Sequence, residues 1–324
     1  MGQKGNLMTY RPDIKVLDAT IRDGGLVNNF FFTDEFVKEL YEANIRAGVD
    51  YMEFGYKASK ELFAPEDFGK WKFCDEEDIR SIVGDNLTDM KIAVMADVGR
   101  TDFTEIPPKK ESVVDLIRVA TYINTIPAAI EMVEHLHEKG YETSVNIMAV
   151  STADSRDVEQ ALELLGHSNV DIIYLVDSYG SLYPEQIRDL TEMYMSVGEK
   201  YGKKIGIHAH NNMQMAFANT IEAATHGASF LDATMMGMGR GAGNCVLEGL
   251  MGFLRNPRYR LVYVLRFVEK YMVELKKQGL NWGYDVPYLL TGLLNQHPRA
   301  AIDKMKTGEK DFARFHTELW DREH

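Results

Sequence analysis

The feature that most constrains the fold is an alternation of short apolar runs with amphipathic segments over most of the chain. Eight runs are nearly continuously apolar and β-branched, as in strands of a parallel sheet buried on both faces. We predict strands over residues 14–20, 51–55, 91–97, 116–121, 143–150, 171–177, 204–210 and 230–236. Helical spacing between them predicts helices over residues 34–47, 76–83, 123–138, 156–165, 184–201, 214–226 and 246–254.

Eight strand–helix units are what an α/β fold of the (β/α)8 type, the TIM barrel, requires. We predict this barrel over residues 12–255 and a helical C-terminal extension over residues 256–324, with helices at 263–277 and 286–294. An open, doubly wound sheet shares the alternation and is the rival fold. The extension is short for an independent domain, so we expect it to pack on the barrel or on a neighbouring subunit of a homo-oligomer.

Charge and cysteine content limit which binding partners and which cellular compartment we expect. The 36 Lys and Arg residues are outnumbered by 49 Asp and Glu, and the net charge of −13 argues against a nucleic-acid partner. The chain has no apolar run long enough to span a membrane and no N-terminal signal-peptide pattern. Its two cysteines, Cys74 and Cys245, cannot build a disulfide framework. We therefore expect a cytoplasmic protein that acts on a small molecule.

Polar residues gather at the predicted C-terminal ends of the strands, where TIM barrels place their active sites. Arg22 and Asp23 follow the first strand and precede Gly24 and Gly25, which we expect to form a tight turn. Glu53 lies inside the apolar second run, and a buried carboxylate needs a cationic or hydrogen-bonding partner. Glu53 is thus either paired structurally or part of the site.

The seventh predicted strand ends in a His-x-His pattern. Residues two apart on a strand point to the same face, so His208 and His210 can both face one metal ion. Asp23 is a candidate oxygen ligand from elsewhere on the rim. Two imidazoles and a carboxylate suit a divalent metal, with Mn²⁺ or Mg²⁺ favoured and Zn²⁺ also compatible.

A glycine-rich loop, Gly-Met-Gly-Arg-Gly-Ala-Gly-Asn over residues 237–244, follows the eighth predicted strand. Its spacing does not fit the Gly-x-Gly-x-x-Gly dinucleotide pattern. Asn244 could cap the last barrel helix or reach the metal through its amide oxygen, and its position alone favours the cap. Four further residues at strand ends are candidates for substrate contacts or for helix caps: Asp97, Asn146, Asp177 and Ser178. Lys57 could form a Schiff base in a metal-free aldolase, which would leave the histidine pair without a purpose.

These motifs together resemble the DRE-TIM metallolyase superfamily, also called the HMG-CoA lyase-like family. The resemblance rests on Arg-Asp-Gly after the first strand, Glu53, His-Ala-His-Asn-Asn over residues 208–212 and the glycine-rich loop, in the family's order. Residues 218–224 and 239–248 are most similar to the 4-hydroxy-2-oxovalerate aldolase branch.

The resemblance implies roles for individual residues. Asp23, His208 and His210 match metal ligands, and Asn244 matches an asparagine at or near the ion. Arg22 matches the arginine that stabilises an enolate oxygen, and Ser178 matches a substrate contact. The segment around Tyr284 and Tyr288 resembles the part of these aldolases that contributes a catalytic tyrosine, with Tyr284 the better match and both tyrosines expected on one helix face.

One position departs from the aldolase pattern. The aldolases have a histidine after Arg-Asp-Gly-x that serves the deprotonation of the substrate hydroxyl, whereas this chain has Leu26. The resemblance therefore predicts a metal-dependent aldolase that cleaves a 4-hydroxy-2-oxo acid through a pyruvate enolate, without identifying its base. It also implies a possible aldehyde dehydrogenase partner. The alternatives are an acyl-CoA condensing enzyme or HMG-CoA-lyase-like lyase of the same superfamily, and a non-catalytic barrel with a binding role.

Overall fold

Eight parallel strands close into a barrel in chain order, and β8 pairs with β1 to complete it. The computed structural model describes residues 11–321. The N-terminal residues 1–10, where a signal peptide would begin, lie outside the described residues. The strands are β1 (Lys15–Asp18), β2 (Tyr51–Tyr56), β3 (Lys91–Asp97), β4 (Leu116–Tyr122), β5 (Glu142–Met148), β6 (Ile172–Asp177), β7 (Lys204–Ala209) and β8 (Phe230–Ala233). The predicted TIM barrel is confirmed, and the open doubly wound sheet is wrong because the strands follow chain order and β8 pairs with β1, so the sheet is closed.

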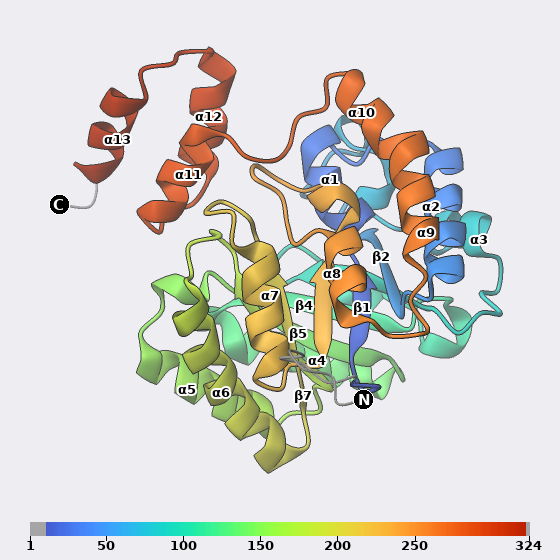
Figure 1. Cartoon of the computed structure of the whole chain (residues 1–324). Coiled ribbons are helices and arrows are strands. Elements are labelled where there is room, and N and C mark those ends of the chain that lie inside the picture. The colour runs from blue at the N-terminus through green and yellow to red at the C-terminus, as the bar shows by residue number, and fades with distance from the viewer. Residues whose placement is uncertain (1–10, 322–324) are drawn as a thin grey trace, which may run out of the picture.

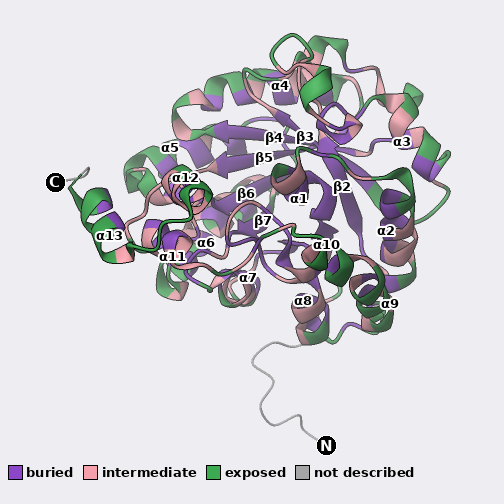
Figure 2. Ribbon diagram, turned by 90° about the horizontal axis from the view of Figure 1, so that it is seen from above, coloured by how far each residue is buried: buried purple, intermediate pink, exposed green. Residues whose placement is uncertain are grey.

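Helices surround the barrel with their polar faces outward. Figure 2 looks onto the barrel and shows buried strands at the centre with helices that are exposed on their outer sides. The helices over this part of the chain are α1 (Thr20–Asn28), α2 (Asp34–Ala47), α3 (Glu76–Val83), α4 (Ile126–Glu138), α5 (Ser155–Gly166), α6 (Pro184–Tyr201), α7 (Ala216–Thr225) and α8 (Leu247–Leu254). All but α1 were predicted to within a few residues.

The predicted tight turn at Gly24 and Gly25 is wrong, because both glycines lie inside α1. A Cβ on Gly25 would lie 2.2 Å from the ring of Phe30, and one on Gly24 would lie 2.9 Å from the sulfur of Met238. The glycines thus allow close packing of side chains against a helix rather than a reversal of the chain. As a result, Arg22 and Asp23 are held on the first turn of a helix above the barrel.

The barrel interior is apolar at one end and ionic at the other. Near the strands' N-terminal ends, one buried layer contains Tyr51, Leu116, Ile172 and Phe230. The next inward-facing residue on three of these strands is charged, because side chains two apart share a face: Glu53, Arg118 and Asp232. The ionic layer therefore lies at the C-terminal side of the barrel.

The C-terminal extension packs on the barrel. Its helices are α9 (Leu261–Phe267), α10 (Val273–Lys277), α11 (Val286–Leu293), α12 (Arg299–Thr307) and α13 (Phe312–Trp320), with π-type hydrogen bonding over Val268–Met272 between α9 and α10. Phe267 of α9 meets Phe36 of α2 with ring centroids 5.2 Å apart. Because α9 packs directly on α2 of the barrel, the predicted domain boundary between residues 255 and 256 stays a proposal.

The extension continues as helices beyond the two that the sequence predicted. Helices α12 and α13 form there because Ala301, Phe315 and Leu319 provide buried apolar positions among the charges. Figure 1 shows α11, α12 and α13 in red, on the side of the barrel where α1 lies. No helix within residues 11–321 is long and apolar enough to cross a membrane.

Candidate metal centre and active site

Asp23, His208 and His210 form a buried cluster at the C-terminal end of the barrel. One ligand atom from each lies within 4.8 Å of the other two. The two imidazoles are side by side because they lie two residues apart at the end of β7, and α1 brings Asp23 to them from the other end of the chain. The structure thus brings together the three residues that the sequence nominated as metal ligands.

Hydrogen bonds fix the orientation of both imidazole rings. The Nδ1 atom of His208 lies 3.0 Å from a carboxylate oxygen of Asp232, and Nδ1 of His210 lies 3.0 Å from the carbonyl oxygen of Asp177. Such partners leave Nε2 as the ligand atom in protein metal sites. In His208 this Nε2 is buried and has no hydrogen-bond partner among the described residues. The donor set and the unpartnered nitrogen fit a bound divalent ion.

Asn244 completes the rim of this cluster. Its Nδ2 donates to the Asp23 carboxylate and, at 3.2 Å, to the carbonyl oxygen of Met238, while its buried Oδ1 has no partner among the described residues. The predicted cap is wrong, because α8 begins at Leu247 without a side-chain cap. A Cβ on Gly239 would lie 2.5 Å from the Asp23 carboxylate, so only glycine lets this loop approach so closely.

The electrostatics of the cluster favour the protonation states that a metal needs. Burial raises the pKa of Asp23, but Arg22 and the two imidazoles outweigh it and hold that pKa well below its usual range. Burial lowers the pKa of His210 to about 3 against the opposing charge of Asp23. At neutral pH the site therefore offers a carboxylate and a neutral imidazole, the forms that bind cations.

A chain of buried ion pairs links the cluster to the barrel interior. Arg22 donates from Nη1 to Asp23 at 2.9 Å and from Nε to Glu53 at 2.8 Å. Arg118 donates to the same Glu53 oxygen at 2.7 Å and to Asp232 at 2.5 Å, and Asp232 holds His208. No described residue bonds Nη2 of Arg22. These ion pairs therefore orient Arg22 and the candidate metal ligand His208.

The sequence reasoning missed Arg118 and Asp232. Their signal was present, since each is a charged residue inside an apolar strand, as Glu53 is. Tyr174 completes their surroundings, because its ring lies 4.4 Å from the Arg118 guanidinium carbon. A Cβ on Gly206 would lie 2.6 Å from that ring, so this glycine makes room for the tyrosine inside the barrel.

Three of the other predicted strand-end residues, Asn146, Asp177 and Ser178, are buried near the same mouth, whereas Asp97 at the end of β3 is partly exposed. The amide oxygen of Asn146 accepts from Ser144 Oγ at 3.0 Å, and Ser178 Oγ accepts from the backbone N–H of Ala149 at 2.8 Å. The Asp177 carboxylate accepts backbone N–H bonds from Ser181 and Leu182, so it holds the loop before α6 and does not cap that helix, whose N-cap is Tyr183. Burial raises the pKa of Asp177 to about 7.

The two candidate tyrosines occupy different environments. Tyr284 is 57% exposed and precedes α11, which begins at Val286, so the predicted common helix face is wrong. Tyr288 is half-buried in α11, and a Cβ on Gly241 would lie 3.1 Å from its ring. Tyr288 thus packs against the loop that carries Asn244.

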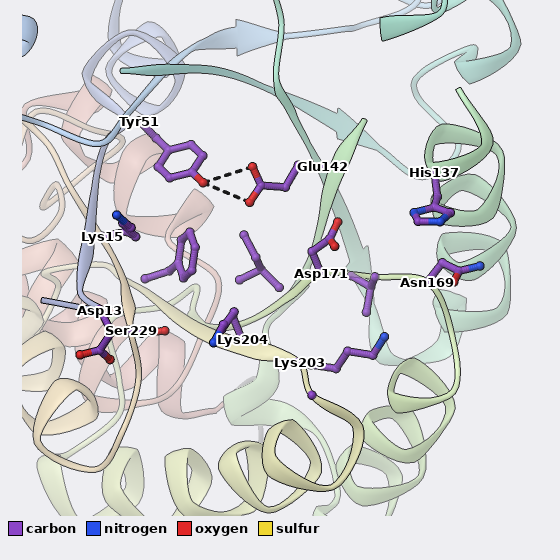
Figure 3. Close-up of a pocket in the computed structure, with 14 residues that line it drawn as sticks. Asp13, Lys15, Tyr51, His137, Glu142, Asn169, Asp171, Lys203, Lys204 and Ser229 are labelled. Atoms are coloured by element: carbon purple, nitrogen blue, oxygen red, sulfur yellow. Dashed lines mark hydrogen bonds between the residues drawn. The ribbon is translucent and has the colours of Figure 1, made fainter. Parts of the chain in front are cut away.

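A separate cavity of about 650 Å³ lies at the opposite, N-terminal end of the barrel. Figure 3 shows Tyr51 pointing at Glu142 there, with its hydroxyl 3.0 and 3.1 Å from the two carboxylate oxygens. Lys15, Asp171 and Lys204 also line this cavity. Both lysines and carboxylates line this cavity, whereas the buried cluster of Asp23, His208 and His210 lies at the other end.

The fold and the buried cluster define a TIM barrel with a candidate divalent-metal site. The HMGL-like family model matches residues 13–263, and the chain belongs to this family of metal-dependent carbon–carbon lyases.

Named relatives differ in their reactions. The chain is 32% identical to an oxaloacetate decarboxylase of Mycobacterium tuberculosis, over 76% of this chain and 71% of the relative. It is 29% identical to a 4-hydroxy-2-oxovalerate aldolase of Pelotomaculum thermopropionicum, over 77% of this chain and 72% of the relative.

Solved structures show the same fold. The N-terminal domain of a candidate aldolase from Bacteroides vulgatus aligns with a TM-score of 0.75 at 27% identity, covering 90% of this chain and 96% of that one. The carboxyl transferase domain of Rhizobium etli pyruvate carboxylase aligns with a TM-score of 0.71 at 16% identity, over 97% of this chain and 57% of that one, which is a likeness of fold alone.

Proposed function

We propose that this protein is a divalent-metal-dependent aldolase that cleaves the C3–C4 bond of a 4-hydroxy-2-oxo acid to pyruvate and an aldehyde. The observation that carries the proposal is the buried cluster of Asp23, His208 and His210 with Arg22 beside it. Cleavage next to a carbonyl leaves an enolate, whose negative charge must be stabilised where it develops. The cluster would hold a cation next to the Arg22 guanidinium, so two positive charges would lie where the enolate develops.

Each residue of the cluster has a defined task in this proposal. Asp23, His208 and His210 hold the ion, with Asn244 Oδ1 adjacent, and the bound ion supplies Lewis acidity toward the 2-oxo acid. Arg22 faces the developing enolate oxygen with Nη2. Glu53 is a positioning residue, because its carboxylate fixes the orientation of Arg22 through the 2.8 Å bond to Nε. Asn146 and Ser178 are proposed substrate contacts at the same end of the barrel.

Proton transfer falls to Tyr288 in this proposal. Leu26 carries no titratable group, and Tyr288 packs against the glycine-rich loop next to the metal cluster. Burial raises the pKa of Tyr288, which keeps its hydroxyl protonated at neutral pH. Cleavage releases the 4-hydroxyl proton as C4 becomes the aldehyde carbonyl. The protonated phenol delivers one proton to C3 of the enolate, so the reaction consumes no net proton.

Decarboxylation of a 2-oxo acid with a carboxylate on C3 is the second candidate. The specific observation that favours it is Leu26, because loss of CO₂ forms the same enolate without deprotonation of a hydroxyl. The relative named as an oxaloacetate decarboxylase supports this candidate. Lys57 supports no Schiff-base alternative, since its Nζ donates to the carbonyl oxygen of Cys74.

The two reactions can be separated by their second product. The metal-stripped protein, reloaded with Mn²⁺, Mg²⁺ or Zn²⁺, is assayed with 4-hydroxy-2-oxopentanoate and with oxaloacetate, and pyruvate, aldehyde and CO₂ are measured separately. We expect metal-dependent pyruvate and aldehyde in equal amounts, with Mn²⁺ or Mg²⁺ more active than Zn²⁺. Asp23→Ala at the same free-metal concentration corrects for catalysis by the ion in solution.

Two outcomes would contradict the aldolase proposal. Release of CO₂ from oxaloacetate without turnover of any 4-hydroxy-2-oxo acid would favour the decarboxylase. A protein that binds Mn²⁺ but turns over neither substrate, and does not exchange the methyl protons of pyruvate with solvent, would favour a non-catalytic barrel. The expected homo-oligomer and aldehyde dehydrogenase partner stay predictions.

A further inference from the structure

Arg240 is a cation at the mouth of the barrel for which the proposed chemistry has no role. It lies in the glycine-rich loop, next to Gly239, whose backbone packs against the Asp23 carboxylate. No described residue accepts a hydrogen bond or forms an ion pair with its guanidinium, and its Nε is buried without a partner. Guanidinium groups next to a buried site are normally paired with carboxylates, so this one is available to an anion that the chain does not supply.

The C-terminal extension places a histidine over the same end of the barrel. Asn295 anchors the segment after α11 by donating to the Ser151 carbonyl at 2.9 Å and accepting from Ser181 Oγ at 2.7 Å. His297 follows, and its ring meets that of Tyr179, which comes directly after β6, at a centroid distance of 5.7 Å. The histidine of the extension therefore lies over the loops that follow β5 and β6.

The glycine-rich loop also meets the extension, because a Cβ on Gly241, the residue after Arg240, would lie 3.1 Å from the ring of Tyr288 in α11. Burial and then the Arg240 charge lower the pKa of His297 to about 4. Nδ1 of His297 accepts from the backbone N–H of Arg299 at 3.1 Å, so the neutral ring carries its proton on Nε2 and is a donor.

We propose that Arg240, assisted by His297, forms a subsite for a second carboxylate at the far end of the substrate. The inference rests on the proposed function and makes it narrower: the substrate is a dicarboxylic 4-hydroxy-2-oxo acid, and the released aldehyde bears the carboxylate. Arg240 also disfavours decarboxylation of any substrate carboxylate that it binds. A carboxylate paired with a guanidinium is stabilised as the anion and loses that pairing when it becomes neutral CO₂.

A matched pair of non-cleavable ligands tests the subsite by binding rather than by turnover. 2-Oxoglutarate and 2-oxopentanoate share a five-carbon 2-oxo acid skeleton, and neither has a 4-hydroxyl group. Calorimetric titration of the Mn²⁺-loaded protein should show tighter binding of 2-oxoglutarate. Arg240→Gln should weaken 2-oxoglutarate on the order of tenfold to a hundredfold, as expected for a lost charge-assisted hydrogen bond, and leave 2-oxopentanoate almost unchanged.

Conservative and remote variants serve as controls. Arg240→Lys keeps the charge and should retain part of the preference for 2-oxoglutarate. Arg46→Gln removes an exposed arginine of α2 that pairs with Glu42, and should change neither affinity. Thermal unfolding of each variant verifies that the barrel is intact.

Failure of the subsite can be told apart from failure of the proposed function. Equal affinity of the wild type for the two ligands, or equal weakening of both in Arg240→Gln, overturns the subsite while metal-dependent exchange of pyruvate methyl protons still supports the lyase. Absence of that exchange and of binding by either 2-oxo acid overturns both proposals.

Discussion

The two ends of the barrel both carry charged side chains but use them differently. At the C-terminal end, the ionic chain from Arg22 to Asp232 is buried, and Glu53, Arg118 and Asp232 are fully enclosed. At the N-terminal end, Lys91 pairs with Glu142 at 2.7 Å while 48% of the lysine and 23% of the glutamate side chain stay exposed. Charges that water can reach need no ligand, whereas buried charges with unpartnered atoms beside them indicate a site that a ligand completes.

Arg118→Met should give the largest effect, and it tests whether the buried end depends on its ion pairs. The substitution leaves the carboxylates of Glu53 and Asp232 buried without their shared cation. We expect the free energy of unfolding to fall by about 3–5 kcal/mol, measured by urea denaturation of the metal-free protein. A loss as small as that of an exposed pair would show that the ionic layer is not coupled to folding.

Arg22→Ala tests the catalytic task of the same chain. Because Arg22 is not itself a ligand, the protein should keep its Mn²⁺ content, while kcat falls on the order of 10²–10³-fold. Metal analysis and steady-state kinetics measure the two effects, with Arg46→Ala as the remote control. Loss of the metal, or retained turnover, would count against the assignment.

Tyr288→Phe tests whether the C-terminal extension contributes a proton donor to this end of the barrel. We expect kcat to fall by about 10²-fold, the lower end of general acid–base contributions, without a change in Mn²⁺ affinity. Tyr284→Phe is the matched control, since that side chain is mostly exposed and its loss should leave kcat almost unchanged. Wild-type rates for both variants would remove the tyrosines from the mechanism.

Asp232→Asn tests the support of a ligand histidine. The asparagine amide lacks the negative charge of the Asp232 carboxylate and therefore holds Nδ1 of His208 more weakly. We expect Mn²⁺ affinity to weaken by about 10–100-fold. Electron paramagnetic resonance of free Mn²⁺ measures this affinity. The urea midpoint measures the loss of stability caused by breaking the Asp232–Arg118 pair, which is a separate effect of the same substitution. Unchanged affinity would mean that His208 is oriented without Asp232.

Lys91→Met at the N-terminal end should give the smallest effect. The pair with Glu142 is solvent-exposed, so we expect the free energy of unfolding to change by less than about 1 kcal/mol, with kcat and Mn²⁺ affinity unaffected. Urea denaturation and the aldolase assay measure both. A change as large as that of Arg118→Met would erase the distinction between the two ends.

Local patterns in the sequence predicted the strands, most helices and the three candidate ligand residues, because strand periodicity and strand-end position are local properties. Helix α1 was missed because Gly24 and Gly25 disfavour helices by themselves. Their place in α1 becomes clear only when Phe30 and Met238 are seen to fill the space beside them. The roles of Arg118 and Asp232 were missed because their pairing joins β2, β4 and β8, which are far apart in the chain.

By itself, the sequence determined a (β/α)8 barrel and the chemistry available at its rim, since apolar periodicity fixes which faces are buried. Tertiary structure decided which charges meet. Closure of the barrel placed Asp232 on His208 and Glu53 between two arginines, and it left Nε2 of His208 and Oδ1 of Asn244 without partners. Docking of the extension brought His297 to Tyr179 above the mouth. Pairings of this kind depend on distances across the fold, which no local pattern in the chain records.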